Sequence, residues 1–225
     1  LPLKAVICSY GNTVLENVIE NNRRVLHFAR ASTDIKLYAG CEAPGCAHVA
    51  YHNIVLPRQE KAGNGLCNVE LPEAPPNFGP LDFADFKNLL KDFTPENPLD
   101  YIITGPATNF AALLAQAEPA LREKIGTVTM MGGKFQSIWE RIPGADFNLA
   151  CDPPAIHSIL ESGIDFRLVP MDATWRYDQS GQAQPAEWTR FAAGGAFGVV
   201  AGAVLRPDGR RGASGTRNFA HWRAV

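Results

Sequence analysis

The fold is decided by a segment that ends at Asn148 and begins Asp100-Tyr101-Ile102-Ile103-Thr104-Gly105-Pro106-Ala107-Thr108-Asn109. Its first apolar run, Tyr101 to Ile103, is too short for a core helix and is typical of a buried parallel strand. Thr104-Gly105-Pro106 breaks this strand. Thr108 or Asn109 is then placed to cap a helix that starts at Phe110.

The same segment contains a second strand, Thr127 to Met131, which Gly132-Gly133 ends. Two parallel strands joined by a helix bring both turns to the carboxyl edge of one sheet, where open α/β sheets bind small ligands. The polar residues of these turns are therefore expected to converge on one pocket: Thr104, Asn109, Asp146 and Asn148. The alternative is that they are ordinary turn and cap residues.

Strands and helices alternate along most of the chain, which predicts an α/β fold with a mainly parallel open sheet and helices on both faces. The expected strands outside the central segment are 3–9, 35–38 and 166–170, and the expected helices are 14–29, 83–93 and 153–162. Thr13, with Glu16 three residues later, has the pattern of a capping box. Asp152 precedes Pro153 as an expected N-cap.

Residues 43–80 are rich in Pro, Gly and Asn and show weak periodicity. We expect a long loop over the ligand edge, either a functional lid or a surface insertion. Residues 1–178 are expected to form the α/β core. Residues 179–225 form a Gly/Ala/Arg-rich C-terminal segment, which we expect to be poorly ordered.

Composition excludes several classes of protein. The 225 residues are 46% hydrophobic and 20% charged, with a net charge of −2, so nothing points to nucleic acid or a membrane surface as a partner. Five cysteines at irregular spacing favour reduced thiols and a cytoplasmic location over a disulfide framework. The strand ends also lack the Gly-x-Gly-x-x-Gly turn of dinucleotide-binding proteins.

Several blocks, in this order, resemble the inosine-uridine-preferring nucleoside hydrolase family. They are Ser9-Tyr10-Gly11-Asn12-Thr13, Gly65-Leu66, Thr104-Gly105-Pro106-Ala107-Thr108-Asn109, Met131-Gly132-Gly133, Asp146-Phe147-Asn148 with Asp152-Pro153, and Val169-Pro170-Met171-Asp172-Ala173-Thr174. The resemblance covers residues 3–175 and implies hydrolysis of a ribonucleoside to ribose and a free base, as in purine and pyrimidine salvage.

The resemblance also implies Ca²⁺ bound to the ribose 2′- and 3′-hydroxyls and to the attacking water. Position by position, the backbone carbonyl of Thr104 matches a calcium ligand. Asn12, Asp146 and Asn148 match ribose-binding residues, with Asp146 standing where the family usually has Glu. His221 lies where a catalytic acid for the leaving base is expected, although Trp222 follows it where the family has Asp. A small-molecule ribonucleoside is the implied partner, and homo-oligomerisation is left open.

This chain departs from the family at its beginning. The family's Asp-x-Asp-x-Gly-x-Asp-Asp cluster has no counterpart, because no Asp or Glu precedes Glu16. The first strand of the family's sheet is expected to be missing with it, which would leave a central position empty. Low or no activity is therefore expected. The alternative is a non-catalytic ribose-binding remnant, or a structural fragment of the fold.

Overall fold

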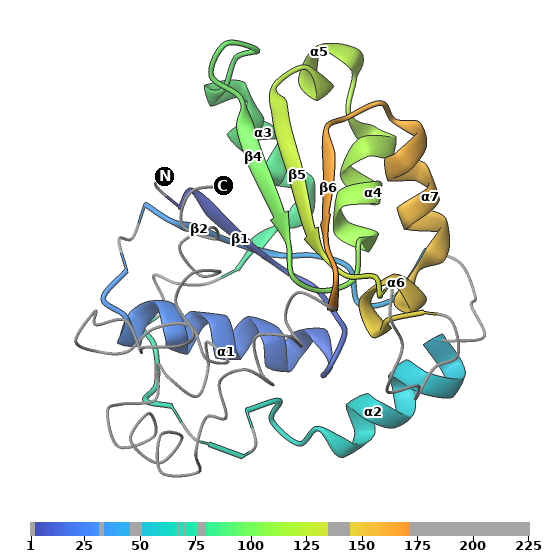
Figure 1. The fold of residues 1–225 in the computed structure, drawn as a ribbon. Coiled ribbons are helices and arrows are strands. Elements are labelled where there is room, and N and C mark those ends of the chain that lie inside the picture. Colours follow the sequence, from blue (N-terminus) through green and yellow to red (C-terminus); the bar gives the residue numbers. More distant parts are fainter. Residues whose placement is uncertain are drawn as a thin grey trace, which may run out of the picture.

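The computed structural model describes residues 3–31, 34–45, 51–66, 68–69, 71–75, 80–134 and 145–171. In this part of the chain, parallel strands form two sheets (Figure 1). The first has the order β1-β2-β3, with β1 at Ala5–Cys8, β2 at Lys36–Ala39 and β3 at Leu81–Asp82. The second has the order β4-β5-β6, with β4 at Leu99–Ile103, β5 at Ile125–Met131 and β6 at Phe166–Val169. The predicted α/β class with parallel strands is confirmed.

Alternation along the strands explains how the second sheet is covered. Tyr101 is paired in register with Val128, and Val128 with Phe166, so one face carries a row of apolar side chains. This face packs on α4, Thr108–Gln116, and α7, Pro153–Glu161, in the main hydrophobic core (Figure 1).

The opposite side of the fold is covered by α1, Leu15–Phe28. Leu15 and Leu26 of this helix pack against Cys8 of β1 and Leu37 of β2 in a separate apolar cluster. Neighbouring residues of β1, Ala5 and Ile7, pack instead against the main core. Helices therefore lie on both faces, as predicted. Among the described residues no strand pairs with both β1 and β4, although both strands contribute to the main core.

Helix starts differ from the predictions by one or two residues. The helix α1 begins at Leu15 with Val14 as N-cap, and the Thr13 hydroxyl accepts a hydrogen bond from the Asn17 side chain instead of capping. The helix α4 begins at Thr108, not Phe110, and has no side-chain cap. By contrast, the carboxylate of Asp152 accepts from the backbone N–H of Ala155 and caps α7 as expected.

The expected helix 83–93 consists of three short pieces: η3 at Phe83–Asp85, α3 at Phe86–Leu89 and η4 at Leu90–Asp92. Two more short helices follow, α5 at Pro119–Arg122 and α6 at Phe147–Cys151. None of the helices in the described part of the chain combines the length and the hydropathy needed to cross a membrane.

The long loop expected at 43–80 is not irregular throughout. It contains a π-helical segment, η1 at Tyr51–Val55, which continues directly into α2 at Leu56–Lys61. Val55 is buried against Tyr10, Cys151 and Phe147, so tertiary packing stabilises helical structure that the weak sequence periodicity did not predict. The predictions for residues 172–225, including the C-terminal segment, concern residues outside the described part of the chain.

Candidate functional site

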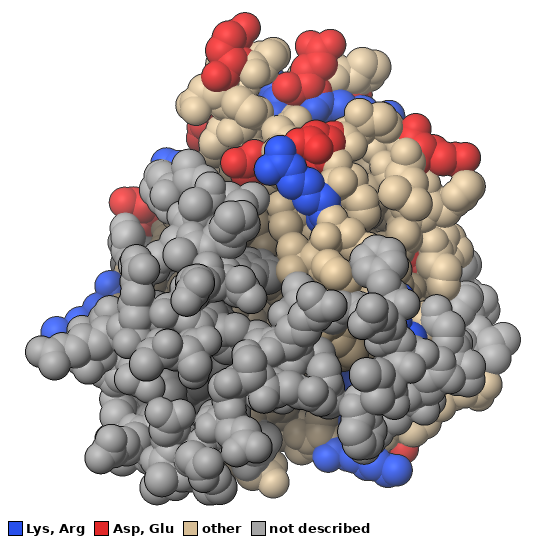
Figure 2. All heavy atoms as spheres, viewed as in Figure 1, with Lys and Arg blue, Asp and Glu red and all other residues tan. Residues whose placement is uncertain are grey.

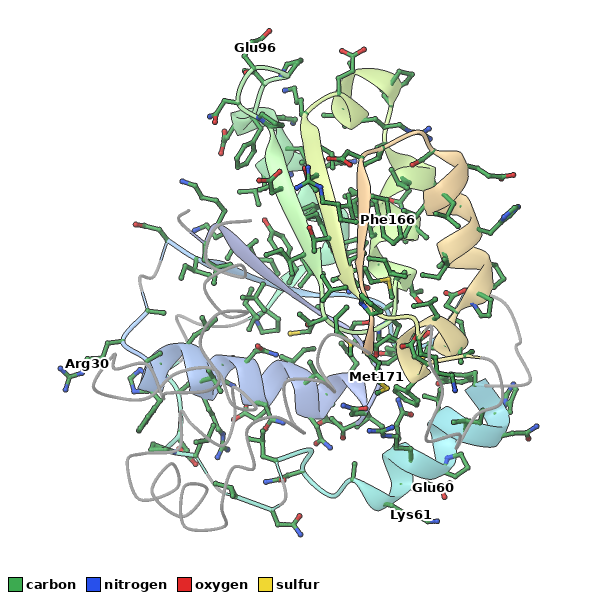
Figure 3. All side chains as sticks on the ribbon, in the orientation of Figure 1. Arg30, Glu60, Lys61, Glu96, Phe166 and Met171 are labelled. Carbon is green, nitrogen blue, oxygen red and sulfur yellow. The ribbon has the colours of Figure 1, made fainter. Side chains whose placement is uncertain are left out.

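The candidate site lies where β4 and β5 end, next to α6 (Figure 1). The side-chain amide of Asn148 joins the two strand ends. Its Nδ2 donates to the carbonyl oxygen of Met131 at 3.0 Å and lies 3.4 Å from the carbonyl oxygen of Thr104. Figure 3 labels Met171, just past the end of β6, at the same end of the sheet. The carboxyl edge predicted to bind ligand is therefore where these residues meet.

The orientation of the Asn148 amide is fixed by its neighbours. Two carbonyl oxygens and the sulfur of Met131, at 3.3 Å, surround the amide nitrogen, and all three are acceptors. Only the NH₂ end can donate to them, so the oxygen Oδ1 is directed away from the strand ends. Asn148 is half-buried, and none of the described residues donates to this oxygen. The arrangement presents one acceptor at the carboxyl edge of the sheet.

Asp146 lies beneath Asn148 and is 5% exposed. Its Oδ1 accepts from the backbone N–H of Asn148 at 2.9 Å, which caps α6, and its Oδ2 accepts from the backbone N–H of Gly133. The carboxylate thus ties the turn after β5 to the start of α6. Gly133 has a φ of +82°, a conformation that side chains disfavour, so this turn requires glycine.

Asn12 lies in the turn after β1 and is exposed. The turn is held from below by α2, where the buried Gln59 donates to the carbonyl oxygens of Gly11 at 3.4 Å and Thr13 at 3.3 Å. Arg58 of the same helix stacks over the ring of Phe147, 4.3 Å from its centroid. The helix α2 lies in the region that was predicted to be a loop. It contacts both the Asn12 turn and α6.

Asn109 does not lie with the polar residues that it was predicted to join. It is 5% exposed, its Nδ2 donates to the carbonyl oxygen of Cys8 at 2.8 Å, and its Oδ1 accepts from the N–H of Cys41 at 2.7 Å. Both ends of the amide are used to hold the ends of β1 and β2 to the start of α4. The convergence predicted for four polar residues holds for Thr104, Asp146 and Asn148 only.

Sequence reasoning missed a buried hydrogen-bonded chain formed by Tyr10, Thr108 and Asp152. The hydroxyls of Tyr10 and Thr108 lie 3.0 Å apart, and Thr108 donates to Asp152 at 2.7 Å. The cap pattern at Asp152 was visible in the sequence. Its second partner was not, because Thr108 lies 44 residues away and Tyr10 lies 98 residues from Thr108.

His221, the expected catalytic acid, lies outside the described residues. Lys61 is exposed at the end of α2 and points outward, away from the strand ends near Met171 (Figure 3). On the face seen in Figure 2, basic and acidic side chains of the described residues alternate around the upper part, with no extended area of one sign.

The described residues do not fit a complete calcium site. Calcium takes about six to eight oxygen ligands. The described part of the chain contains no group of three or more His, Cys, Asp or Glu side chains that could hold a metal ion. The carbonyl oxygen of Thr104 already lies 3.4 Å from the amide nitrogen of Asn148, and each oxygen of Asp146 accepts from a backbone N–H, so each of these oxygens keeps one lone pair for a further partner. These residues alone do not supply enough oxygen ligands to hold the ion.

Curated relatives of the chain are ribonucleoside hydrolases. The pyrimidine-specific ribonucleoside hydrolase RihA of Escherichia coli O1:K1 / APEC is 31% identical over 175 residues, which are 77% of this chain and 53% of that protein. RihA of Enterobacter sp. (strain 638) is 30% identical over 194 residues, 86% of this chain and 58% of that protein. The chain thus spans little more than half the length of the curated relatives it matches.

Solved structures share the fold. A purine-preferring ribonucleoside hydrolase from Gardnerella vaginalis has a TM-score of 0.68 at 24% identity, over 90% of this chain and 62% of that one. An inosine-uridine preferring nucleoside hydrolase from Bacillus anthracis has a TM-score of 0.58 at 18% identity, over 91% of this chain and 68% of that one. The family model described as inosine-uridine preferring nucleoside hydrolase matches residues 1–213. With this match spanning nearly the whole chain, the protein belongs to the inosine-uridine preferring nucleoside hydrolase family.

Proposed function

We propose that this chain carries the ribose-binding part of a ribonucleoside hydrolase, which converts a nucleoside and water into ribose and a free base. The observation that carries the proposal is the fixed amide of Asn148, whose Oδ1 is the acceptor presented at the carboxyl edge of the sheet. A sugar hydroxyl is a suitable donor to this oxygen. Family membership supplies the substrate class, and the curated relatives are ribonucleoside hydrolases.

The other residues have distinct proposed roles. Asn12 is exposed on the neighbouring turn and offers a second amide to the sugar. Asp146 contributes through the turn that it holds and through the second lone pairs of its carboxylate oxygens, which can accept from ribose hydroxyls. We keep His221 as the proposed acid that protonates the leaving base, a role suited to a group that titrates near neutral pH.

Nucleoside hydrolases are commonly metal-dependent, and calcium is the ion we propose, with the Thr104 carbonyl as one ligand. Glycosidic cleavage passes through an oxocarbenium-like transition state, and a hard cation would activate water and hold the sugar hydroxyls. Since the described residues supply no carboxylate cluster, we expect weak calcium binding and little or no turnover by this chain. The competing proposal is a ribose-binding protein without catalysis, or a structural form of the fold.

The setting of the function is also a proposal. Salvage of purines or pyrimidines would follow from nucleoside cleavage, and the reduced thiols favour the cytoplasm. Both base classes stay open, because the relatives include pyrimidine-specific and purine-preferring enzymes. We also propose that the protein self-associates into a homo-oligomer, and we assign no particular surface to this contact.

Calorimetry with ribose, inosine, uridine and Ca²⁺, together with a turnover assay on both nucleosides, tests the proposal. We expect Asn148→Ala to weaken ribose or nucleoside binding by roughly tenfold or more, through loss of one hydrogen bond and of the fixed strand ends. Asn88→Ala is the matched control, because Asn88 is exposed on α3 and its side chain accepts one hydrogen bond, from Lys91, within the described part of the chain.

Two outcomes would contradict these expectations. A wild-type protein that binds neither ribose nor either nucleoside would refute the ribose site. Tight calcium binding with rapid turnover would instead refute the expectation of low activity. It would mean that the chain is an active ribonucleoside hydrolase.

A further inference from the structure

Tyr10, Thr108 and Asp152 form a hydrogen-bonded network. Each of them is close in sequence to a different proposed site residue. Tyr10 is two residues before Asn12, Thr108 is four residues after Thr104, and Asp152 is four residues after Asn148. The three residues belong to the turn after β1, the start of α4 and the junction of α6 and α7. A contact among them therefore links the three backbone segments that carry the candidate site.

The hydrogen bonds of this network all run in one direction, from donor to acceptor. The Thr108 hydroxyl has one proton, which it donates to Oδ2 of Asp152 at 2.7 Å. It can then only accept from the Tyr10 hydroxyl, 3.0 Å away, which is itself 3.4 Å from the carbonyl oxygen of Cys151. Burial raises the pKa of the Tyr10 phenol, so it stays a donor. The bonds run from Tyr10 through Thr108 to Asp152, and such aligned bonds polarise one another.

The two end residues of the network, Tyr10 and Asp152, also bond to backbone groups. Asp152 uses its other oxygen, Oδ1, to accept from the N–H of Ala155 at 3.2 Å and so caps α7. The backbone N–H of Tyr10 donates to the carbonyl oxygen of Cys41, just past β2, at 3.2 Å. Tyr10, Thr108 and Asp152 are 1%, 6% and 4% exposed, so water does not replace these bonds. Both ends of the network are therefore bonded to backbone groups of other segments.

We infer that Tyr10, Thr108 and Asp152 are positioning residues, which set Asn12, the Thr104 carbonyl and Asn148 at the mutual distances that a ribose requires. This inference rests on the proposed function for its ligand, but the network itself makes a prediction for the free protein. A misplacement of about 1 Å at a binding constellation is enough to lower affinity or rate strongly. Without the network, the Asn148 amide and the Asn12 turn should change their relative environment even when the fold is intact.

The experiment compares two tyrosine variants of the full chain labelled with ¹⁵N. Tyr10→Phe removes the first hydroxyl of the network. Tyr38→Phe is the control, because Tyr38 is also buried, at 3%, but packs against Phe86 in the main core. In the absence of ligand, Tyr10→Phe should shift the NMR signals of the Asn148 side-chain amide and the Asn12 backbone amide. Tyr38→Phe should leave both signals in place.

A second pair of variants covers the case in which Tyr10→Phe does not fold. Thr108→Val removes the hydroxyl at nearly constant shape and should reproduce the shifts, while Thr108→Ser keeps the hydroxyl and should restore the wild-type signals. Where ribose or inosine binds, Tyr10→Phe and Thr108→Val should weaken it roughly threefold to tenfold. Folded Tyr10→Phe and Thr108→Val proteins with unshifted Asn148 and Asn12 signals would overturn the inference. If the wild type binds no ligand, the proposed function fails, and the ligand-free signals still decide the positioning role.

Discussion

Replacing Asn109 by alanine should destabilise the fold well beyond the effect of an ordinary surface change. The side chain is 5% exposed and makes two bonds, to the carbonyl oxygen of Cys8 at 2.8 Å and from the N–H of Cys41 at 2.7 Å. The Cys8 carbonyl keeps a bond from the N–H of Gly40 at 3.1 Å in the variant. The Cys41 N–H loses the acceptor it has in the described structure.

The size of the effect follows from these partners. Two hydrogen bonds are worth about 1 kcal/mol each, and the part-buried N–H of Cys41, left without its acceptor, costs the lower end of the range of about 1–3 kcal/mol for a buried group. We expect Asn109→Ala to lower the free energy of unfolding by about 2–4 kcal/mol. Asn88→Ala, on the exposed side of α3, should change it by less than about 0.5 kcal/mol.

Asn109→Asp separates the hydrogen bond from the shape of the side chain. The new carboxyl would face the Cys8 carbonyl oxygen with an acceptor where the amide has a donor. Only its protonated form could donate there, and burial disfavours the charge, so its pKa in the folded state would be raised above the unfolded value of about 3.9. Because the folded pKa would be raised, the contribution of this carboxyl group to the stability of the Asn109→Asp variant is present at low pH. It is lost as the pH rises through the folded pKa.

Urea unfolding followed by circular dichroism, at about pH 7 and about pH 4, measures both effects. Relative to wild type at the same pH, Asn109→Asp should be weakest at neutral pH and should recover on acidification. An Asn109→Ala protein as stable as Asn88→Ala, or an Asn109→Asp deficit that does not change with pH, would refute the assigned role of the Asn109 amide.

Two other predictions concern residues around the same strand ends. A Cβ at Gly40 would collide with the carbonyl oxygen of Cys8 and the amide of Asn109, whereas one at Gly45 would meet none of the described residues within 4 Å. Gly40→Ala should therefore cost about 1–3 kcal/mol in a thermal-shift or urea assay and Gly45→Ala almost nothing; equal stabilities would contradict this contact. Burial raises the pKa of the Cys8 and Cys151 thiols to about 12 each, so at about pH 8 both should be protonated and resist iodoacetamide until urea unfolds the chain. Mass spectrometry of the alkylated peptides checks this, and rapid labelling of either thiol in the folded protein would count against its burial.

All the strands of the described residues except β3 were predicted from the sequence, because each is a short, mainly apolar run followed by a turn; β3, Leu81–Asp82, has only two residues and no apolar run, and it was not predicted. Tyr101 to Ile103 and Thr127 to Met131 lie within the observed β4 and β5, which extend only two residues further toward the N-terminus. Helix starts were less predictable, since several polar residues compete for each cap. Thr13 had the capping-box pattern, but its hydroxyl bonds to Asn17 and Val14 takes the cap position.

The candidate site could be predicted only as far as its location at the sheet edge. The sequence pattern treated Asn109 and Asn148 alike, since both follow a strand end. One is enclosed by β1 and β2, and the other lies at the edge of the sheet. That difference depends on contacts between residues about 70 to 100 positions apart in the chain, such as Asn109 with Cys41 and Cys8, which no local pattern contains.

The π-helical segment η1 accommodates one residue of chain length next to α2. A π turn holds one residue more than an α turn but completes nearly the same rotation, so removing one residue from Tyr51–Val55 would let a regular α-helix form with little change in the phase of the helix. Gln59 could then keep its bonds to the carbonyl oxygens of Gly11 and Thr13. Removing a residue from α2 itself would instead rotate the two parts of the helix by about 100° relative to each other. The support of the Asn12 turn therefore depends more on the number of residues in α2 than on the number in η1.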